Sequence, residues 1–236
     1  MPAGPLAATG ARRRCRGIFW ARVAPFAIYI AFLAVALALP TVAPAADWRW
    51  LYPVKVGLVA AALFFLRRHF GELAAPGLTT REGQWAVGIG LAVFVLWINL
   101  DLPWVALKAD GEGGGYDPRL ADGRIDWLLA GLRLAGAALV VPVMEELFWR
   151  SLVMRWLDRP DFLAQDPRTV SRRALLVSSV VFGLEHHLWL AGVLAGLAYG
   201  ELYRRSGKLW ASILAHGVTN GLLGLWVLWS GQWQYW

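Results

Sequence analysis

The stretch "IFWARVAPFAIYIAFLAVALAL", residues 18–39, decides the fold class of this 236-residue chain. It holds a single charged side chain, Arg22, and is about as long as the roughly 20 apolar residues that cross a bilayer as a helix. Similar apolar runs recur along nearly the whole chain, which is 58% hydrophobic and contains 15 Trp. A soluble domain of this length would need far more polar residues to cover its surface. The sequence therefore predicts an all-α fold, a polytopic transmembrane helical bundle.

A basic segment, "RRRCR" at residues 12–16, precedes this first apolar run, so a signal peptide is the rival interpretation. The run is too long for the core of a signal peptide and more apolar segments follow it, so we expect a retained helix. The single cysteine, Cys15, excludes an intramolecular disulfide. It lies among arginines, where an exposed thiol is expected and lipidation is the alternative.

About seven spans are expected, with the N-terminus in the cytoplasm. Their predicted ranges are 18–39, 50–66, 84–100, 126–157, 173–187, 188–203 and 209–230. They divide the chain into a cytoplasmic basic segment (1–17), N-terminal helices with an external Gly-rich loop (18–123), and a second transmembrane region (124–236). No internal repeat or low-complexity tract is evident.

The charges between the spans agree with this topology. Arg and Lys gather near the N-terminus and in the connections 67–81, 159–173 and 204–208, whereas the stretch 101–126 is mainly acidic. Basic connections remain in the cytoplasm under the positive-inside rule, so the C-terminus is expected outside. The basic residues behind the net charge of +7 therefore orient the protein in a lipid bilayer, which is its expected partner. Because they lie between apolar segments instead of forming one soluble patch, no nucleic acid is expected to bind.

Two further segments have alternative interpretations. The sequence "ADGEGGGYDP", residues 109–118, is typical of a flexible external linker, and a lid over an active site is the sharper alternative. The closing "WVLWSGQWQYW", residues 226–236, is typical of an aromatic belt at the membrane surface.

Ionisable and polar groups within apolar spans are costly and therefore mark functional candidates. Three clusters remain after those near span ends are set aside. They are Glu145, Glu146 and Arg150; Glu185, His186 and His187; and His216 with Asn220. Any one cluster could be structural, as a helix-joining ion pair or an interhelical hydrogen bond. Three clusters on three separate spans favour a site.

Helical spacing assigns partners within the first cluster. Glu146 and Arg150 are four residues apart, so they share a helix face and can form a charge-assisted pair. Glu145 and Arg150 are about 140° apart around the axis, which leaves Glu145 without a helical partner and suits it to general acid–base work. Pro142 removes a backbone donor just upstream and is expected to bend the helix there.

The third cluster presents an imidazole and a carboxamide on one helix face, because His216 and Asn220 are also four residues apart. Such a pair is suited to donating hydrogen bonds to a developing oxyanion. Glu185 and His187 are weaker candidates, because near a span end both can simply face water.

The three clusters resemble the CAAX prenyl protease and bacteriocin-processing family (CPBP, or Abi), glutamic-type intramembrane endopeptidases. That family carries E-E-x-x-x-R, F-x-x-x-H and H-x-x-x-N in this order, matched here by "EELFWR" (145–150), "FGLEH" (182–186) and "HGVTN" (216–220). The similarity covers roughly 125–230, which makes the second transmembrane region (124–236) the expected catalytic core. The surrounding sequence is most similar to the bacterial CAAX prenyl protease-related subgroup, which is associated with exosortase and PEP-CTERM protein-sorting systems.

The resemblance implies roles for these residues. Glu145 would activate water with help from His186, and His216 and Asn220 would stabilise the oxyanion. Glu146 and Arg150 would hold the site in shape. No metal or other cofactor is implied. The resemblance further implies a multi-pass protein of the bacterial inner (plasma) membrane, a membrane-embedded or membrane-associated protein substrate, and exosortase-system components as partners.

Two other functions compete with this one. A zinc-dependent intramembrane peptidase could use two histidines and a glutamate, although no H-E-x-x-H occurs in the chain. A non-catalytic membrane partner in protein sorting or bacteriocin immunity, or a transporter, could also carry intramembrane charges. One conflict is open: the predicted spans place the Glu145–Glu146 pair toward the cytoplasm and His186 toward the outside, yet one active site requires them to meet.

Overall fold

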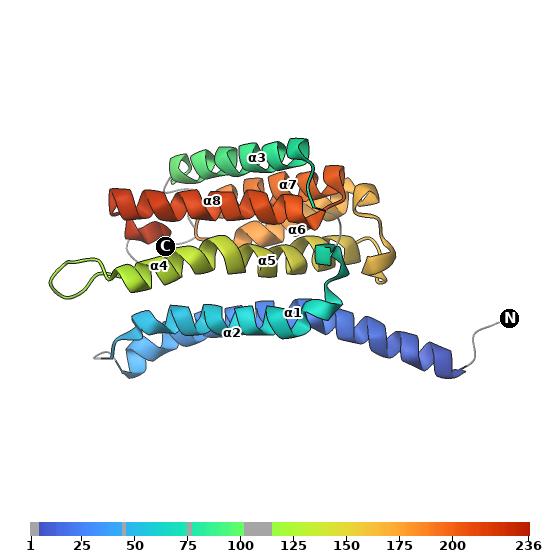
Figure 1. The fold of residues 1–236 in the computed structure, drawn as a ribbon, viewed down its shortest axis with the longest axis horizontal. Coiled ribbons are helices and arrows are strands. Elements are labelled where there is room, and N and C mark those ends of the chain that lie inside the picture. The colour runs from blue at the N-terminus through green and yellow to red at the C-terminus, as the bar shows by residue number, and fades with distance from the viewer. Residues whose placement is uncertain (1–4, 44–45, 75–76, 102–114) are drawn as a thin grey trace.

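The computed structural model describes residues 5–43, 46–74, 77–101 and 115–236, and over this part of the chain it is a bundle of helices without β-strands (Figure 1). The predicted all-α polytopic bundle is thus confirmed. The principal helices are α1 (Pro5–Val42), α2 (Leu51–Leu66), α3 (Thr80–Asn99), α4 (Trp127–Ala135), α5 (Val141–Glu146), α6 (Arg172–Leu184), α7 (Trp189–Ser206) and α8 (Leu209–Ser230). The side chain of Cys15 and residues 109–114 of the Gly-rich loop lie outside what the structure describes.

Five helical stretches are long and apolar enough to cross a membrane. They are 16–39, 48–69, 80–99, 127–154 and 209–230. The fourth is continuous through two π-helical segments, η5 (Gly136–Val140) and η6 (Leu147–Met154), which flank α5. Short 3₁₀ turns connect the remaining elements: η1 (Trp48–Trp50), η2 (Arg67–His69), η3 (Gly71–Ala74), η7 (Phe162–Ala164), η8 (Pro167–Thr169) and η9 (Trp233–Tyr235).

The remaining two predicted spans, 173–187 and 188–203, form a hairpin of α6 and α7. With 13 residues, α6 is about 20 Å long, shorter than the roughly 30 Å hydrocarbon core of a bilayer. The expectation that 173–187 crosses the membrane by itself is therefore corrected. Because a hairpin returns the chain to its starting side, the predicted orientation of α8 is the same with five spans or seven.

Glycines allow the two arms of this hairpin to pack backbone against backbone. A Cβ atom added at Gly192 would lie 2.8 Å from Cα of Gly183, and one at Gly196 would lie 2.9 Å from Cα of Ser179. Small residues of this kind are typical of close helix pairs in membranes, where no hydrophobic drive brings helices together. The two arms are thereby fixed to each other, and α7 packs in turn against α8 and α3 (Figure 1).

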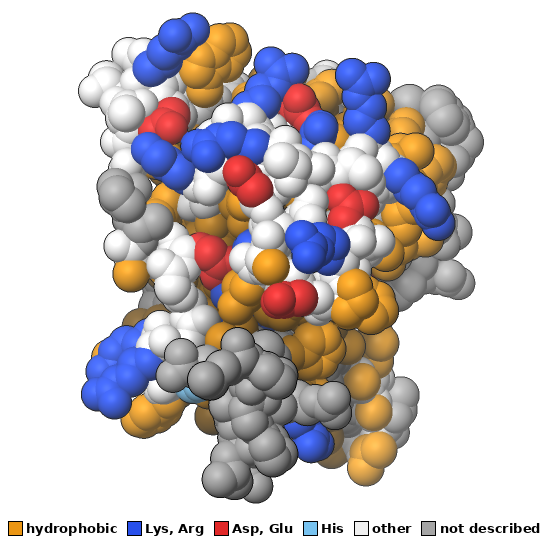
Figure 2. All heavy atoms as spheres, turned by 90° about the vertical axis from the view of Figure 1, so that its right-hand side faces the viewer, with side chains coloured by type: hydrophobic (Ala, Val, Ile, Leu, Met, Phe, Trp, Pro, Cys, Tyr) orange, Lys and Arg blue, Asp and Glu red, His pale blue; other side chains and the backbone are white. Residues whose placement is uncertain are grey.

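The end of the bundle where α3 and α8 begin carries most of the exposed cations. Figure 2 shows Lys and Arg side chains spread over this face among a few carboxylates. Arg22 is an exception: it is buried, donates to Ser151 at 2.8 Å, and pairs with Glu72, which also pairs with Arg155 at 2.7 Å. The first helix is thus attached to η6 by a hydrogen bond and to Arg155, the residue after η6, through the shared carboxylate of Glu72.

The opposite end of the bundle is closed by the C-terminus. Gly231 has φ +71°, a left-handed conformation suited to glycine, and it ends α8 so that η9 folds back over the helices. Trp236 is consequently buried, and its carbonyl accepts from the amide of Tyr116 at 2.8 Å. The predicted aromatic belt fits the exposed Trp229 but is wrong for Trp236, which packs inside.

The close α6–α7 contact predicts a stability effect. Gly196→Ala places a methyl group 2.9–3.1 Å from the backbone and Cβ of Ser179, so it should lower the free energy of unfolding by about 1–3 kcal/mol. Thermal unfolding in detergent micelles measures this. Gly88→Ala on α3 is the matched control, because a Cβ there meets nothing within 4 Å. Equal melting temperatures for the two variants would contradict the proposed tight contact.

Candidate active site

The first element of the site is a buried carboxylate that joins two helices. Glu146, at the end of α5, is fully buried and forms an ion pair with Arg150, with Oε2 and Nε 3.1 Å apart. Its other oxygen, Oε1, lies 2.9 Å from Nδ1 of His216 on α8. The predicted i,i+4 pair is therefore present, and its second partner, His216, was not predicted from the sequence. An ionised carboxylate only accepts, so His216 donates through Nδ1 and directs Nε2 elsewhere.

Glu145 lies beside this pair and points the other way, as its helical position predicts. Its Oε2 is buried, makes no hydrogen bond among the described residues, and lies 3.9 Å from Nε2 of His216. That separation is too long for a direct hydrogen bond and short enough for one water molecule to bond both atoms. Glu145 thus presents a buried carboxylate oxygen that makes no hydrogen bond among the described residues and faces Nε2 of His216.

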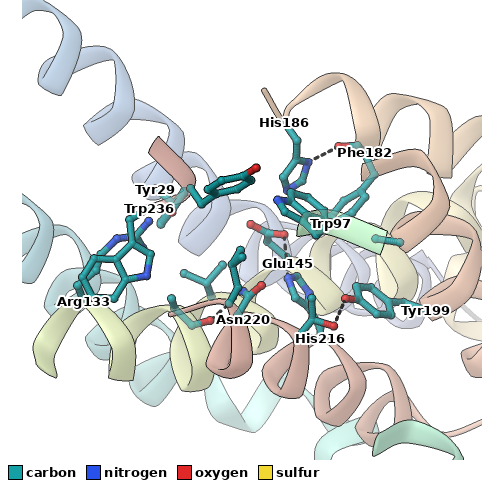
Figure 3. Close-up of a pocket in the computed structure, with 16 residues that line it drawn as sticks. Tyr29, Trp97, Arg133, Glu145, Phe182, His186, Tyr199, His216, Asn220 and Trp236 are labelled. Atoms are coloured by element: carbon teal, nitrogen blue, oxygen red, sulfur yellow. Dashed lines mark hydrogen bonds and ion pairs between the residues drawn. The ribbon is translucent and has the colours of Figure 1, made fainter. Parts of the chain in front are cut away.

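All four predicted catalytic side chains line one cavity of about 160 Å³ (Figure 3). They are Glu145, His186, His216 and Asn220. The cavity is completed by aromatic and apolar side chains, among them Trp97, Phe182, Tyr199 and Trp236. Glu146 and Arg150 do not line it and instead lie behind the wall that carries Glu145 and His216. The geometric condition for a single active site is met, and the catalytic roles stay predictions.

The short length of α6 removes the conflict in depth that the predicted spans created. The helix begins at the arginine-rich end and stops at Leu184, so the turn 185–188 brings His186 to the same cavity as Glu145. His186 is half-buried and His187 is exposed, which identifies His186 as the inward histidine. Its Nδ1 donates to the carbonyl of Phe182 at 2.8 Å, since a carbonyl oxygen only accepts. In the neutral ring, Nε2 is then an unprotonated acceptor.

Asn220 is held by a backbone defect that Pro142 creates. The amide of Val141 donates to the carbonyl of Gly136, a bond between residues five apart that is typical of a π turn. The next bond of this kind would join Pro142 to Ala137, but proline has no N–H. Asn220 supplies the missing donor, with its Nδ2 2.9 Å from the carbonyl oxygen of Ala137. One amide hydrogen of Asn220 is used in this way and the second remains available to the cavity.

Tyr199 and Thr219 support the site although the sequence patterns did not single them out. The Tyr199 ring stacks on His216 with centroids 5.0 Å apart, and its hydroxyl donates to Thr219 at 2.7 Å. Thr219 in turn donates to the carbonyl of Gly90 at 2.8 Å, which connects the site to α3. The only sequence signal for these residues is a hydroxyl within an apolar helix, which is too common to be specific.

Glu185, the acidic neighbour of His186, accepts a hydrogen bond from Trp149 at 3.1 Å and does not line the cavity. The described residues contain no group of three or more His, Cys, Asp or Glu side chains arranged to hold a metal ion.

Comparison with known proteins finds similarity to membrane peptidases. Residues 127–222, which contain all three motifs, match a family model described as "Type II CAAX prenyl endopeptidase Rce1-like". The chain is also 29% identical over 159 residues to "Putative membrane peptidase YdiL" of Bacillus subtilis (strain 168). That alignment covers 61% of this chain, which spans about 60% of the length of the curated relative. No solved structure matches. The predicted resemblance is thus confirmed for this region, and the exosortase-associated subgroup stays a prediction.

The buried ion pair predicts a large stability effect at Glu146. Glu146→Gln leaves the guanidinium of Arg150 buried without its counter-charge, so the free energy of unfolding should fall by about 3–5 kcal/mol. Chemical or thermal unfolding in detergent measures the loss. Glu201→Gln is the matched control, because Glu201 pairs with Arg204 and Arg205 at a more exposed position, where the cost should stay below about 1 kcal/mol.

The bond between Asn220 and Ala137 predicts coupling to Pro142. Asn220→Ala should cost about 1–3 kcal/mol of stability, because it leaves a buried carbonyl without a donor. The cost should shrink in a Pro142→Ala background, where residue 142 regains an N–H that can reach the same carbonyl. Unfolding free energies of the two single variants and the double variant measure this coupling. Strictly additive effects would show that the two residues act independently.

Proposed function

We propose that this protein is a glutamic-type intramembrane endopeptidase that hydrolyses a peptide bond of a membrane-embedded or membrane-associated protein. The observation that carries the proposal is the unbonded Oε2 of Glu145, 3.9 Å from His216 on the wall of a cavity that His186 and Asn220 also line. Burial of a carboxylate without a hydrogen-bond partner lowers the stability of the fold, so its presence here indicates a functional role.

Glu145 is the general base of the proposed mechanism. Its Oε2 accepts a proton from water as the water oxygen bonds to the carbonyl carbon of the scissile peptide. Nε2 of His186, unprotonated in the neutral ring, can accept the second hydrogen of that water and so orient its lone pair. Aromatic side chains in the lining shield these groups in part from bulk water, which strengthens their electrostatic interactions.

The electron pair of the scissile carbonyl moves to its oxygen, and His216 and Asn220 stabilise the resulting oxyanion. The second amide hydrogen of Asn220 can donate to it, because only one is used by Ala137. His216 donates through Nε2 in its imidazolium form, and Oε1 of Glu146, 2.9 Å from Nδ1, holds the ring in this orientation. Such fixed donors supply a large share of the catalysis in acyl transfer.

Collapse of the tetrahedral intermediate breaks the C–N bond. The proton held on Glu145 passes to the leaving nitrogen, so that one water molecule is consumed and an acid and an amine are released. Glu146 and Arg150 take no part in the proton transfers; they hold His216 and the helix that carries Glu145.

We further propose a multi-pass location in a bacterial inner membrane, in keeping with the apolar helices and the cations gathered at one end. Exosortase-system components as partners stay a prediction that rests on the resemblance alone.

Replacement of Glu145 tests the mechanism. Glu145→Gln keeps the shape of the side chain but cannot accept the proton, so cleavage should fall by about 100-fold or more. Purified protein in liposomes, incubated with a library of internally quenched apolar peptides, provides the rate. Glu201→Gln should cleave at the wild-type rate, and the thermal stability of Glu145→Gln should be kept.

Full activity of Glu145→Gln would exclude this mechanism. Stoichiometric zinc in the purified protein, lost together with activity on chelation, would favour the zinc peptidase instead. Normal function in cells after Glu145→Ala and His216→Ala together would favour a non-catalytic membrane partner.

A further inference from the structure

Three buried hydrogen-bond donors without an acceptor gather at the end of the bundle opposite the arginine-rich face. They are the hydroxyl of Tyr116, Nε of Arg133 and Nε1 of Trp236. The guanidinium carbon of Arg133 lies 5.9 Å from the ring centroids of both Tyr116 and Trp236, so the donors belong to one locality. Buried polar atoms are nearly always bonded, and three unbonded donors together indicate a missing acceptor.

Two cations at this place also form no ion pair with a carboxylate among the described residues. Lys55 on α2 is 6% exposed and Arg133 on α4 is half-buried, and neither forms an ion pair within the described residues. Their neighbours are aromatic faces: Nζ of Lys55 lies 3.9 Å from the ring centroid of Tyr29, and Cζ of Arg133 lies 4.3 Å from that of Tyr52. Aromatic faces attract cations but supply no acceptor oxygen.

The two carboxylates that line the groove beside these cations are already engaged. A groove of about 550 Å³ contains Lys55 and Arg133 and is also lined by Asp47 and Asp117. Asp47 pairs with Arg49 at 2.6 Å, and Asp117 pairs with Arg119 at 2.6 Å. The Arg49 contact lowers the pKa of Asp47 to about 2, which keeps that carboxylate ionised and bound to its own partner. Among the described residues that line the groove, Lys55 and Arg133 are therefore left without a paired carboxylate.

The groove adjoins the candidate active site. Tyr29, Arg133 and Trp236 line both the groove and the catalytic cavity, and Figure 3 shows these three side chains on one side of Glu145. A peptide bound in the groove could therefore extend to the carboxylate of Glu145. This continuity favours a substrate over a lipid or a free ion, because neither of those has to reach Glu145.

We propose that Lys55, Arg133, Tyr116 and Trp236 form a binding subsite for a carboxylate of the peptide substrate. Acceptor oxygens of a carboxylate match three N–H or O–H donors and two cations, and charge-assisted bonds of this kind are short and strong. The carboxylate is either the C-terminus of the peptide or an acidic side chain. This inference rests on the proposed peptidase function, since it assigns the ligand as substrate.

Peptide binding tests the subsite without relying on cleavage. The probes are three fluorescein-labelled Ala/Leu peptides: one with a free C-terminal carboxylate, its C-terminal amide, and an amide that carries one internal Asp. Fluorescence anisotropy with the Glu145→Gln protein in phosphatidylcholine nanodiscs gives the dissociation constants. At least one carboxylate peptide should bind about 10-fold more tightly than the plain amide, and the peptide that does so identifies the source.

The preference should depend on the proposed donors. Arg133→Gln should reduce the ratio of the affinities for the carboxylate and amide peptides to near one. Trp236→Phe, which keeps an aromatic ring and removes the indole N–H donor, should reduce this ratio in part. Arg172→Gln, an exposed cation at the opposite end, is the matched control and should leave the ratio unchanged. Equal binding of all three peptides, or a ratio unaffected in both subsite variants, would overturn the inference.

Three further outcomes bear on this inference, and the last two separate it from the proposed function. Loss of the preference when phosphatidylglycerol is added to the nanodiscs would overturn it in favour of a lipid phosphate site. Carboxylate-selective binding by a protein whose wild-type form cleaves no peptide would support the subsite and contradict the peptidase. Cleavage without any carboxylate preference in binding would support the peptidase and contradict the subsite.

Discussion

The carboxylate of Glu146 is the contact on which the rest of the site depends. It is fully buried, and its two oxygens hold Arg150 on its own helix and His216 on α8, 70 residues further along the chain. A buried charge of this kind is tolerated only when its partners satisfy it, so the positions of both helices are tied together. That constraint in turn fixes the distance between Glu145 and the free nitrogen of His216.

A second constraint comes from Pro142, which has no backbone N–H to donate. Pro142 cannot donate to Ala137 in the π turn, and Asn220 makes the bond from α8 instead. The same amide then faces the cavity with its second hydrogen. The proline thus sets where the proposed oxyanion donor lies, and the helix that carries Glu145 is attached to α8 on both sides of that residue.

The sequence predicted what depends on local spacing. Glu146 and Arg150 pair because they are four residues apart, and Glu145 points elsewhere for the same reason. The sequence did not predict contacts between distant elements, such as His216 with Glu146, because helical periodicity carries no information on how helices pack. It also missed the early end of α6 and the return of Trp236 after Gly231, since an apolar run looks the same whether it faces lipid or protein.

The proposed carboxylate subsite has a geometric consequence for where cleavage occurs. Arg133 and Glu145 belong to one continuous helical stretch, 127–154, and are 12 residues apart, or about 18 Å along its axis. An extended peptide advances about 3.3 Å per residue, so a chain anchored at Arg133 would reach Glu145 within about five residues. The side chains reach toward a shared cavity and shorten this span. An anchor at a fixed distance would also restrict the sliding of a long apolar peptide past the active site. This restriction lowers the entropic cost of placing one particular peptide bond beside Glu145.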